Sequence, residues 1–276
     1  MEKESLRTLQ LCILDIALEF KRICDKHGLD YFLIGGTLLG AVRHHGFIPW
    51  DDDMDVGMSR KDYEKFLKVA PKELGSQFFL QTYCTDKAFA HGFAKIRLNG
   101  TILLEDYAEH SKQHNGIFLD VFPYDNMPEN NFMLKSQYLK FKVLKWAAMG
   151  KTDYDFKESK KKYFSFAMSK ALFFLSKKQC IDKMIKVCTK YQGRKTENII
   201  NWFGAYKYSE YMDAKCARDL ILMDFEGYEF KVPAAYQNLL HNMYGDYMKL
   251  PPPEKRGNQH AMINVSLGGY VPKCKK

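Results

Sequence analysis

The sequence predicts an α+β fold in which an N-terminal half of mixed helices and short strands is followed by a helical insertion. Apolar residues recur at helical spacing through residues 6–23, which is typical of an amphipathic helix. Residues 30–36 and 53–58, and four runs between 78 and 122, have the length and pattern of strands. Residues 130–190 are helical in character and rich in lysine. This mixture favours the α+β class.

The first helix is expected to end near His27, because Gly28 suits the left-handed conformation that closes many helices. The run DYFLIGG, residues 30–36, predicts a strand that leads into a second helix at two glycines. That helix lies within TLLGAVRHHG and is expected to close at Gly46.

The run DMDVGM, residues 53–58, alternates acidic and apolar residues and predicts a strand with one wet face. A third helix should begin after Ser59, which can form a capping interaction with Asp62, and should end at Pro71. Four further strands are expected in FFLQTY, FAKIRL, TILLEDY and GIFLDVFP, which lie between residues 78 and 123.

The run LILMDFEGYEFKVP predicts a hairpin that turns at Glu226-Gly227 and ends at Pro233, and a last helix is expected in AAYQNLLHNMYG. The predicted organisation is a core, a basic helical insertion and a C-terminal return that packs on the core, assigned to residues 1–129, 130–200 and 201–276.

Composition predicts a cytoplasmic protein. Hydrophobic residues make up 46% of the 276 residues, which is ample for a packed core. The opening MEKESLRTLQ is charged and precedes no apolar signal segment, and no apolar run reaches the length of a membrane span. The seven cysteines are scattered without a CxxC pair, which argues against a disulfide framework and a structural zinc site.

The net charge of +9 is concentrated in one segment. Residues 132–190 contain 15 Lys and 4 acidic residues, so this segment carries +11 and the rest of the chain −2. It contains no arginine, the usual reader of bases, so a nucleic-acid partner is not expected.

Four aspartates, at positions 51, 52, 53 and 55, lie within five residues and predict a cation site. Alternation along a strand would place Asp53 and Asp55 on one face, with Asp51 possible on the same face. Paired carboxylates suit Mg²⁺, or Mn²⁺, which takes oxygen ligands and completes its shell with water and substrate phosphate.

Other readings of the acidic run fit less well. An EF-hand loop starting at Asp51 needs Gly at 56 and Glu at 62, where the chain has Val56 and Asp62. Gly35 and Gly40 are spaced as in a P-loop, but no Lys-Ser/Thr follows. A phosphatase-type DxD motif and a solvated acidic turn are less favoured and stay open.

Two further features favour phosphate chemistry. The run LIGG, residues 33–36, places glycines at a helix N-terminus, where backbone amides and the helix dipole bind phosphate. Asp120 stands alone in the apolar run GIFLDVFP, and a lone buried carboxylate is costly unless it has a charged partner or a function. Glycines that bind phosphate, paired aspartates that bind a metal and a third acidic residue are together typical of enzymes that catalyse nucleotidyl transfer.

The runs LIGGTLLGAVRHHGFIPWDDDMDVGM, FAKIRLNGT and GIFLDVFPYD together resemble the LicD family of phosphocholine transferases, which are related to the fukutin-type alditol-phosphate transferases. The resemblance covers residues 29–125, and YGDYMKLPPPEKR is similar to the family's tail. It implies the polymerase-beta type of nucleotidyltransferase fold, a mixed sheet flanked by helices.

The resemblance also implies a reaction and a site. Members transfer a phospho-alcohol, commonly phosphocholine from CDP-choline, to a sugar hydroxyl of a cell-surface glycan and release CMP. CDP-ribitol, CDP-glycerol and CDP-ethanolamine are the alternative donors. The implied metal ligands are Asp53, Asp55 and Asp120, the last of which could instead be a general base. The implied diphosphate-binding residues are Gly35, Gly36 and Thr37, joined by Arg43, Lys95 and Arg97.

Two expectations concern partners. Trp202 and Tyr206 are spaced by one helical turn in NWFGAYKYSEY and could form an aromatic cage for choline, although a core stripe is the commoner meaning of that spacing. The lysine-rich segment mixes lysine with Phe, Leu and Trp, which favours peripheral contact with anionic lipid at the inner face of the cytoplasmic membrane, near a lipid-linked glycan acceptor. A non-catalytic, basic membrane-docking module is the alternative of a different class.

Overall fold

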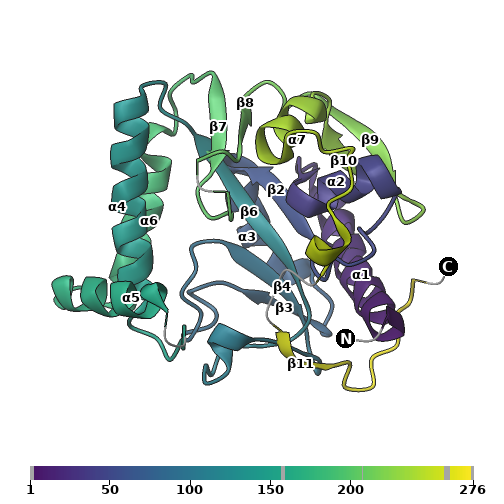
Figure 1. The fold of residues 1–276 in the computed structure, drawn as a ribbon, viewed down its shortest axis with the longest axis horizontal. Helices are drawn as coiled ribbons and strands as arrows, with labels where there is room; N and C mark the ends of the chain where they lie inside the picture. Colours follow the sequence, from purple (N-terminus) through teal and green to yellow (C-terminus); the bar gives the residue numbers. More distant parts are fainter. Residues whose placement is uncertain (1–2, 157–158, 207, 258–261, 275–276) are drawn as a thin grey trace.

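The computed structural model describes residues 3–156, 159–206, 208–257 and 262–274, and it confirms the α+β class. A mixed sheet is flanked by helices, and a separate group of helices stands at one end of the molecule (Figure 1). No helix in these ranges is both long enough and apolar enough to cross a membrane.

The main sheet has seven strands within the described residues. Five of them follow the order β1-β2-β6-β4-β3, and β7 and then β8 continue from the far part of β6. β2 runs parallel to β6, whereas the other neighbours are antiparallel. The bounds are Phe32–Leu33 for β1, Asp55–Ser59 for β2, Phe78–Gln81 for β3, Ala94–Leu98 for β4, Phe118–Asn126 for β6, Asn198–Asn201 for β7 and Tyr211–Asp213 for β8.

Helices α1 (Lys3–His27) and α3 (Arg60–Glu73) pack against the sheet and against each other. The apolar positions of α1 that recur at helical spacing are almost completely buried, so this helix confirms its predicted periodicity. The Ser59 hydroxyl accepts a hydrogen bond from the Asp62 amide and caps α3, as predicted. Arg60 then forms a buried ion pair with Asp125 of β6, at 2.7 Å.

A second group of elements gathers at one end of the sheet. Helix α2 (Gly35–His44) lies against α7 (Tyr236–Tyr244) and against the hairpin of β9 (Leu220–Phe225) and β10 (Tyr228–Pro233). The hairpin turns at Glu226-Gly227 as predicted, and both residues have a positive φ. The Glu226 carboxylate accepts two hydrogen bonds from Arg7 and one from the Phe47 amide, which ties the hairpin to α1 and to the loop after α2.

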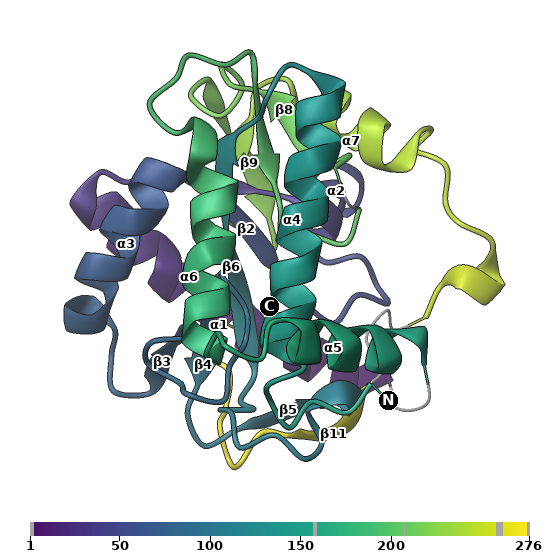
Figure 2. The same cartoon turned by 90° about the vertical axis from the view of Figure 1, so that its left-hand side faces the viewer.

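The predicted helical insertion consists of α4 (Asn131–Met149), α5 (Lys160–Ala171) and α6 (Lys177–Cys188). Figure 2 shows α4 and α6 side by side and α5 across one end of the pair. The chain rejoins the sheet at Asn198, the first residue of β7, after the short helix η2 (Thr189–Tyr191). The remaining elements are β5 (Ile102–Glu105), which pairs with β11 (Met262–Ser266) outside the main sheet, and the short helices η1 (Asp106–Ala108) and η3 (Pro253–Lys255).

Three local predictions are wrong. Helix α3 continues through Pro71 to Glu73, because a proline in the last turn removes one donor while the Leu74 amide still bonds the Ala70 carbonyl. Helix α2 closes at His45, which has a φ of 54°, and not at Gly46.

The third error concerns the strand expected over residues 53–58. β2 begins only at Asp55, so Asp53 lies in the preceding loop and its orientation does not follow from strand alternation.

Candidate active site

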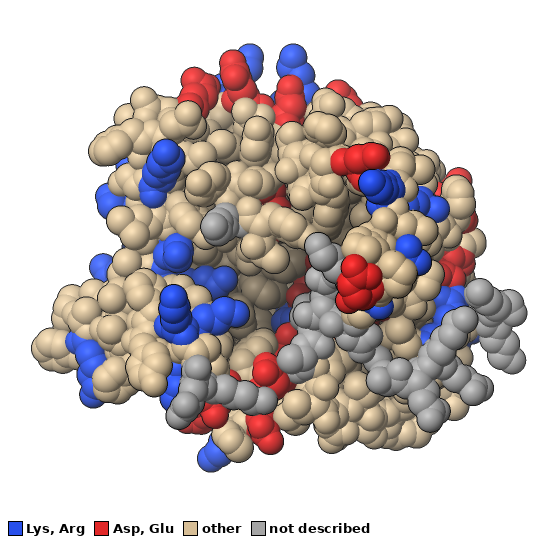
Figure 3. Space-filling model, in the orientation of Figure 1, with Lys and Arg blue, Asp and Glu red and all other residues tan. Residues whose placement is uncertain are grey.

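A cavity of about 880 Å³ lies beside the first residues of β2 and β6. Figure 3 shows this face of the molecule, where a hollow separates the lysine-rich side around α4 and α5 from the side around α7. The cavity walls come from the start of α2, the loop before β2, the first half of β6, α4, the segment after β7 and the segment after α7. Parts of the chain that are far apart in sequence therefore build one site.

Several carboxylates of the cavity come from the loop before β2 and from the first residues of β2 and β6. Asp55 and Asp120 are register partners in the parallel ladder, so their side chains share one face of the sheet. Both line the cavity, and so do Asp51 and Asp53 from the loop. The three predicted metal ligands are thus brought to one cavity, although the strand pattern accounts for two of them.

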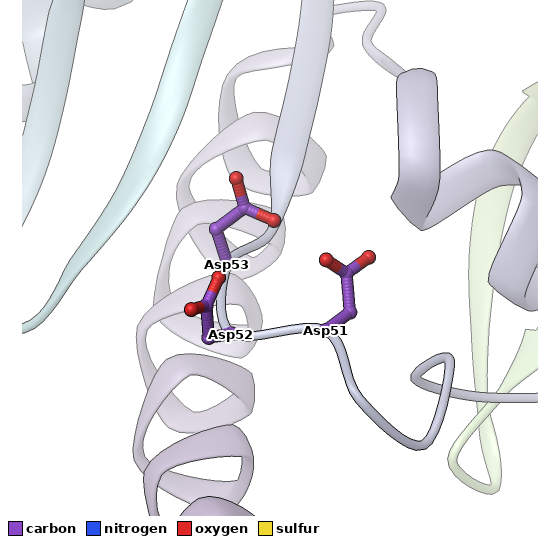
Figure 4. A group of neighbouring side chains, drawn as sticks. All are labelled: Asp51, Asp52 and Asp53. Atoms are coloured by element: carbon purple, nitrogen blue, oxygen red, sulfur yellow. The ribbon is translucent and has the colours of Figure 1, made fainter. Parts of the chain in front are cut away.

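The loop itself carries a tight group of acids. One carboxylate oxygen from each of Asp51, Asp52 and Asp53 lies within 4.8 Å of the others (Figure 4). Asp52 is fully buried and does not line the cavity, whereas Asp51 and Asp53 do. Hard carboxylate oxygens are the ligands that Mg²⁺ and Mn²⁺ prefer, so this donor set fits the predicted divalent cation. Asp51, which the sequence indicated only as a possible member of the ligand face, is a further candidate ligand.

The N-terminus of α2 borders the same acids. Gly35 and Gly36 line the cavity, and Gly35 has a φ of 57°, which favours glycine. A Cβ atom on Gly36 would lie 2.7 Å from an Asp51 carboxylate oxygen, so this position has no room for a side chain. Among the described residues no side chain caps this helix start. Its amides and dipole are therefore suited to binding an anion beside these carboxylates.

Thr37 has a different position from the one predicted. Its hydroxyl accepts a hydrogen bond of 2.8 Å from the Asp55 amide, and the residue does not line the cavity. Thr37 therefore fixes the first residue of β2 and does not face a ligand in the cavity.

Lys95 of β4 pairs with Asp120 from the opposite side of β6. The two residues are register partners, and the Lys95 ammonium lies 2.9 Å from one Asp120 oxygen and 3.1 Å from the other. Burial raises the pKa of Asp120, and the charge of Lys95 opposes that rise. Lys95 does not line the cavity, so it acts on the site through Asp120.

Arg97 also shares this face of β4 but lies deeper. Its guanidinium donates 2.7 Å hydrogen bonds to the Gln81 side chain and to the Gly116 carbonyl, and it packs over the Phe118 ring. It is 1% exposed and does not line the cavity. Lys95 and Arg97 are two residues apart on β4 and neither lines the cavity, so their contact with a diphosphate stays a prediction.

Arg43 lines the cavity, and its guanidinium is engaged with the opposite wall. It donates a 2.7 Å hydrogen bond to the Tyr247 carbonyl. Burial lowers the pKa of Arg43. The residue therefore anchors the segment after α7, and its charge faces the cavity from that position.

The aromatic pair expected in residues 201–211 is only half present. Residues 202–206 form bends and turns after β7, so Trp202 and Tyr206 are not related by a helical turn. Trp202 is 1% exposed and belongs to the core. Tyr206 does line the cavity, where its ring meets that of Tyr244 edge-on at 5.4 Å.

This aromatic wall is larger than the sequence indicated and contains a carboxylate. Trp50, Phe203 and Tyr247 also line the cavity, together with Glu210. The Glu210 carboxylate accepts hydrogen bonds of 2.9 Å from the Asn201 side chain and the Tyr206 amide. Burial raises its pKa, and these hydrogen bonds oppose the rise.

Lys145 of the helical insertion also lines the cavity. It lies on α4, and burial, reinforced by the charges of Lys161 and Lys142, lowers its pKa to about 8, against the influence of Glu210. The sequence offered no signal for this residue, because 15 lysines crowd residues 132–190.

Comparisons with known proteins identify the family of this chain. The model of the LicD/FKTN/FKRP nucleotidyltransferase domain matches residues 28–160, which include the α2 start and all four cavity aspartates of the β2 and β6 region. The lipopolysaccharide cholinephosphotransferase LicD of Haemophilus influenzae is 33% identical over 94% of this chain and 97% of its own length. This chain belongs to the LicD family.

A more distant member of the LicD family is the human ribitol 5-phosphate transferase FKRP, which is 30% identical over 42% of this chain and 21% of its own length. The mouse protein of the same name has the same identity and coverage. The named members are phosphotransferases, so the family is enzymatic. This finding confirms the predicted resemblance and weighs against a non-catalytic module.

Proposed function

We propose that this protein transfers phosphocholine from CDP-choline to a sugar hydroxyl of lipopolysaccharide or of a lipid-linked precursor of a cell-surface glycan, and releases CMP. The pairing of Asp55 with Asp120 on one face of the sheet, beside the α2 start, carries the proposal. The fold is proposed to be of the polymerase-beta nucleotidyltransferase type, whose carboxylates occupy neighbouring strands in this way.

In the proposed reaction the acceptor hydroxyl oxygen attacks the phosphorus that bears choline. The bond from that phosphorus to the bridging oxygen breaks, the oxygen leaves with CMP, and the acceptor proton passes to a base. A divalent cation, when bound, neutralises the diphosphate charge and stabilises the leaving group. Asp53, Asp55 and Asp120 would hold it, with Asp51 as a further candidate.

The protein's own groups position the donor. The α2 amides at Gly35 and Gly36 would bind the diphosphate. Lys145 and Arg43 supply positive charge from opposite sides of the cavity, and Thr37 holds the amide of Asp55. Lys95 favours the ionised form of Asp120, which metal binding or uptake of the acceptor proton requires, against the opposing effect of burial.

The aromatic wall supports choline over a polyol. A quaternary ammonium group binds aromatic faces and has no hydrogen-bond donor to satisfy, and cation–π contacts of this kind contribute about 0.5 to 2 kcal/mol each. Tyr206, Tyr244, Trp50 and Tyr247 line the cavity together with the carboxylate of Glu210. A ribitol or glycerol donor would instead require several polar partners for its hydroxyl groups.

The three predicted segments of the chain each contribute a different part of the proposed site. The core, residues 1–129, supplies the carboxylates and the phosphate-binding helix. The insertion, residues 130–200, supplies Lys145, and the return, residues 201–276, supplies the aromatic wall. Use of a different donor alcohol would require different residues in the aromatic wall but the same carboxylates and phosphate-binding helix in the core.

The deciding experiment measures CMP release from CDP-choline, CDP-ethanolamine, CDP-glycerol and CDP-ribitol, each with Mg²⁺, with Mn²⁺ and with excess chelator. We expect turnover of CDP-choline that depends on the metal. Turnover of a polyol donor alone would replace choline by that alcohol and leave the reaction class standing. Absence of CMP release from every donor, with purified lipopolysaccharide or a glycan acceptor present, would overturn the proposal.

A further inference from the structure

Helix α5 and the turn that follows it expose an unusual group of large side chains. Tyr163 is 67% exposed, Phe166 61%, Phe173 78% and Phe174 65%. These four residues are called the α5 aromatic surface. Isolated exposed aromatics are normal on soluble proteins, but four within twelve residues form a patch that indicates an interaction site.

The buried face of α5 is formed partly by small residues. Ser165 and Ser169 are buried, and both lie close to Gly150 at the end of α4, where a Cβ atom would meet the Ser165 carbonyl oxygen. An ordinary surface helix buries its large apolar residues and exposes its small polar ones. In α5 Ser165 and Ser169 face inward, whereas Tyr163 and Phe166 are exposed. Phe164 meets the Trp146 ring and Met168 packs against the core, so packing within this protein accounts for those two side chains but not for the exposed rings.

The same surface is basic. Lys160, Lys161, Lys162 and Lys170 are exposed, and α5 contains no acidic residue. The Lys170 ammonium lies 5.4 Å from the centre of the Phe166 ring. Aromatic rings surrounded by lysines are typical of segments that lie in the interface of an anionic membrane, where rings enter the headgroup region and lysines meet lipid phosphate.

Charge also argues against another occupant. A second copy of this chain would bring the same lysines face to face, and like charges oppose such a contact. An anionic lipid surface offers an apolar region for the aromatic rings and negative charge for the lysines. We propose that the α5 aromatic surface docks this protein on an anionic membrane.

Docking through α5 would bring the cavity close to the lipid. Lys161 on α5 lies near enough to Lys145 to lower its pKa, and Lys145 lines the cavity. Figure 1 shows α5 projecting from the end of the α4 and α6 pair, and Figure 3 shows lysines between this region and the hollow. A lipid-linked acceptor would therefore reach the site from the surface that holds the protein.

The test is co-sedimentation with phosphatidylcholine vesicles, with and without phosphatidylglycerol, over a range of salt concentrations. The unmodified protein should bind only the anionic vesicles and should be released by salt. Phe173→Ser/Phe174→Ser should weaken binding about tenfold or more, because two rings no longer enter the interface. Phe132→Ser, at a residue 80% exposed on α4, is the matched control and should bind normally.

Thermal unfolding of each variant shows whether it is folded, and a second variant, Lys160→Gln/Lys161→Gln/Lys162→Gln, isolates the charge contribution. Equal binding by the Phe173→Ser/Phe174→Ser and unmodified proteins would overturn the proposal. Binding that ignores lipid charge would do the same. A dimer that dissociates on the phenylalanine substitutions would identify a second copy as the occupant and also overturn it. Vesicle binding requires no turnover, so this outcome is independent of the donor assay.

Discussion

Asp55 of β2 and Asp120 of β6 stand opposite each other in a parallel ladder, and Lys95 of β4 stands opposite Asp120 in the antiparallel ladder on its other side. Three charged side chains therefore form one row across three adjacent strands. At one end of the row the Lys95 ammonium lies 2.9 Å from an Asp120 carboxylate oxygen. At the other end Asp55 lines the cavity. The register of the strands therefore fixes the positions of these three charged groups without a ligand.

Replacing Asp55 by Asn should abolish most of the activity while the protein stays folded. The change removes one anionic ligand but keeps the shape of the side chain, and we expect CMP release to fall roughly 10²- to 10³-fold. Binding of Mn²⁺, followed by electron paramagnetic resonance, should weaken in parallel. Asp30→Asn, at an exposed residue paired with Lys231, is the control and should behave as the unmodified protein. Normal turnover in Asp55→Asn would refute the assignment.

Lys145 should give the reaction an alkaline limit. Its pKa is about 8, so the side chain is cationic below that pH and neutral above it. If the cation binds the diphosphate, kcat/KM for CDP-choline should decline as the pH rises through about 8. Lys145→Met should lower kcat/KM at neutral pH and remove that decline.

The neighbouring Lys142, which does not line the cavity, provides the comparison for this profile. Lys142→Met should keep the alkaline limit and shift it slightly upward, because one positive charge near Lys145 is lost. An unchanged profile in Lys145→Met would assign the alkaline limit to another group.

Tyr206→Leu should weaken the recognition of choline. The substitution removes one aromatic face from the cavity, and a cation–π contact of about 1 to 2 kcal/mol corresponds to a rise in KM of about five- to thirtyfold. We expect kcat to change little. Tyr208→Leu is the control, since Tyr208 packs against Tyr138 and does not line the cavity. Equal KM values in the two variants would remove Tyr206 from the choline site.

Arg60→Met should destabilise the fold without touching the cavity. Arg60 and Asp125 are both buried and joined by two hydrogen bonds of 2.7 Å, so loss of the cation leaves an unpaired carboxylate in the core. Breaking such a pair costs about 3 to 5 kcal/mol, measurable by urea unfolding. The double variant Arg60→Met/Asp125→Leu should recover much of the loss. A change of less than about 1 kcal/mol in Arg60→Met would contradict the expectation.

The sequence was most informative where a pattern repeats or a motif is local. The buried face of α1, the cap at Ser59 and the turn at Glu226-Gly227 each depend on neighbours within a few residues, and all three are found as predicted. The high cost of a lone carboxylate in an apolar run also identified Asp120, which lines the cavity from β6. The start of β2 was misjudged because alternating Asp and apolar residues continue into the loop at Asp53.

The rest of the site depends on contacts between distant parts of the chain. Strand period puts Lys95 and Arg97 on one face, but it does not reveal that Asp120 and Gln81 already hold their charged groups. Lys145 and Glu210 line the same cavity although their positions in the sequence differ by 65, and neither lies in a recognisable motif. Such pairings follow from packing of the helical insertion against the sheet, which local sequence does not encode.

The hydrogen bond from Arg43 to the Tyr247 carbonyl joins the part of the chain that the family domain matches to a part that lies outside that match. The family domain matches residues 28–160, whereas Tyr206, Glu210, Tyr244 and Tyr247 lie beyond it. Under the proposed function, the carboxylates that would carry out the reaction lie within the matched part, most of the aromatic wall lies outside it, and this bond joins the two. A designer who wishes to change the transferred group would keep the carboxylates and rebuild Trp50 together with the segment from 201 to 252.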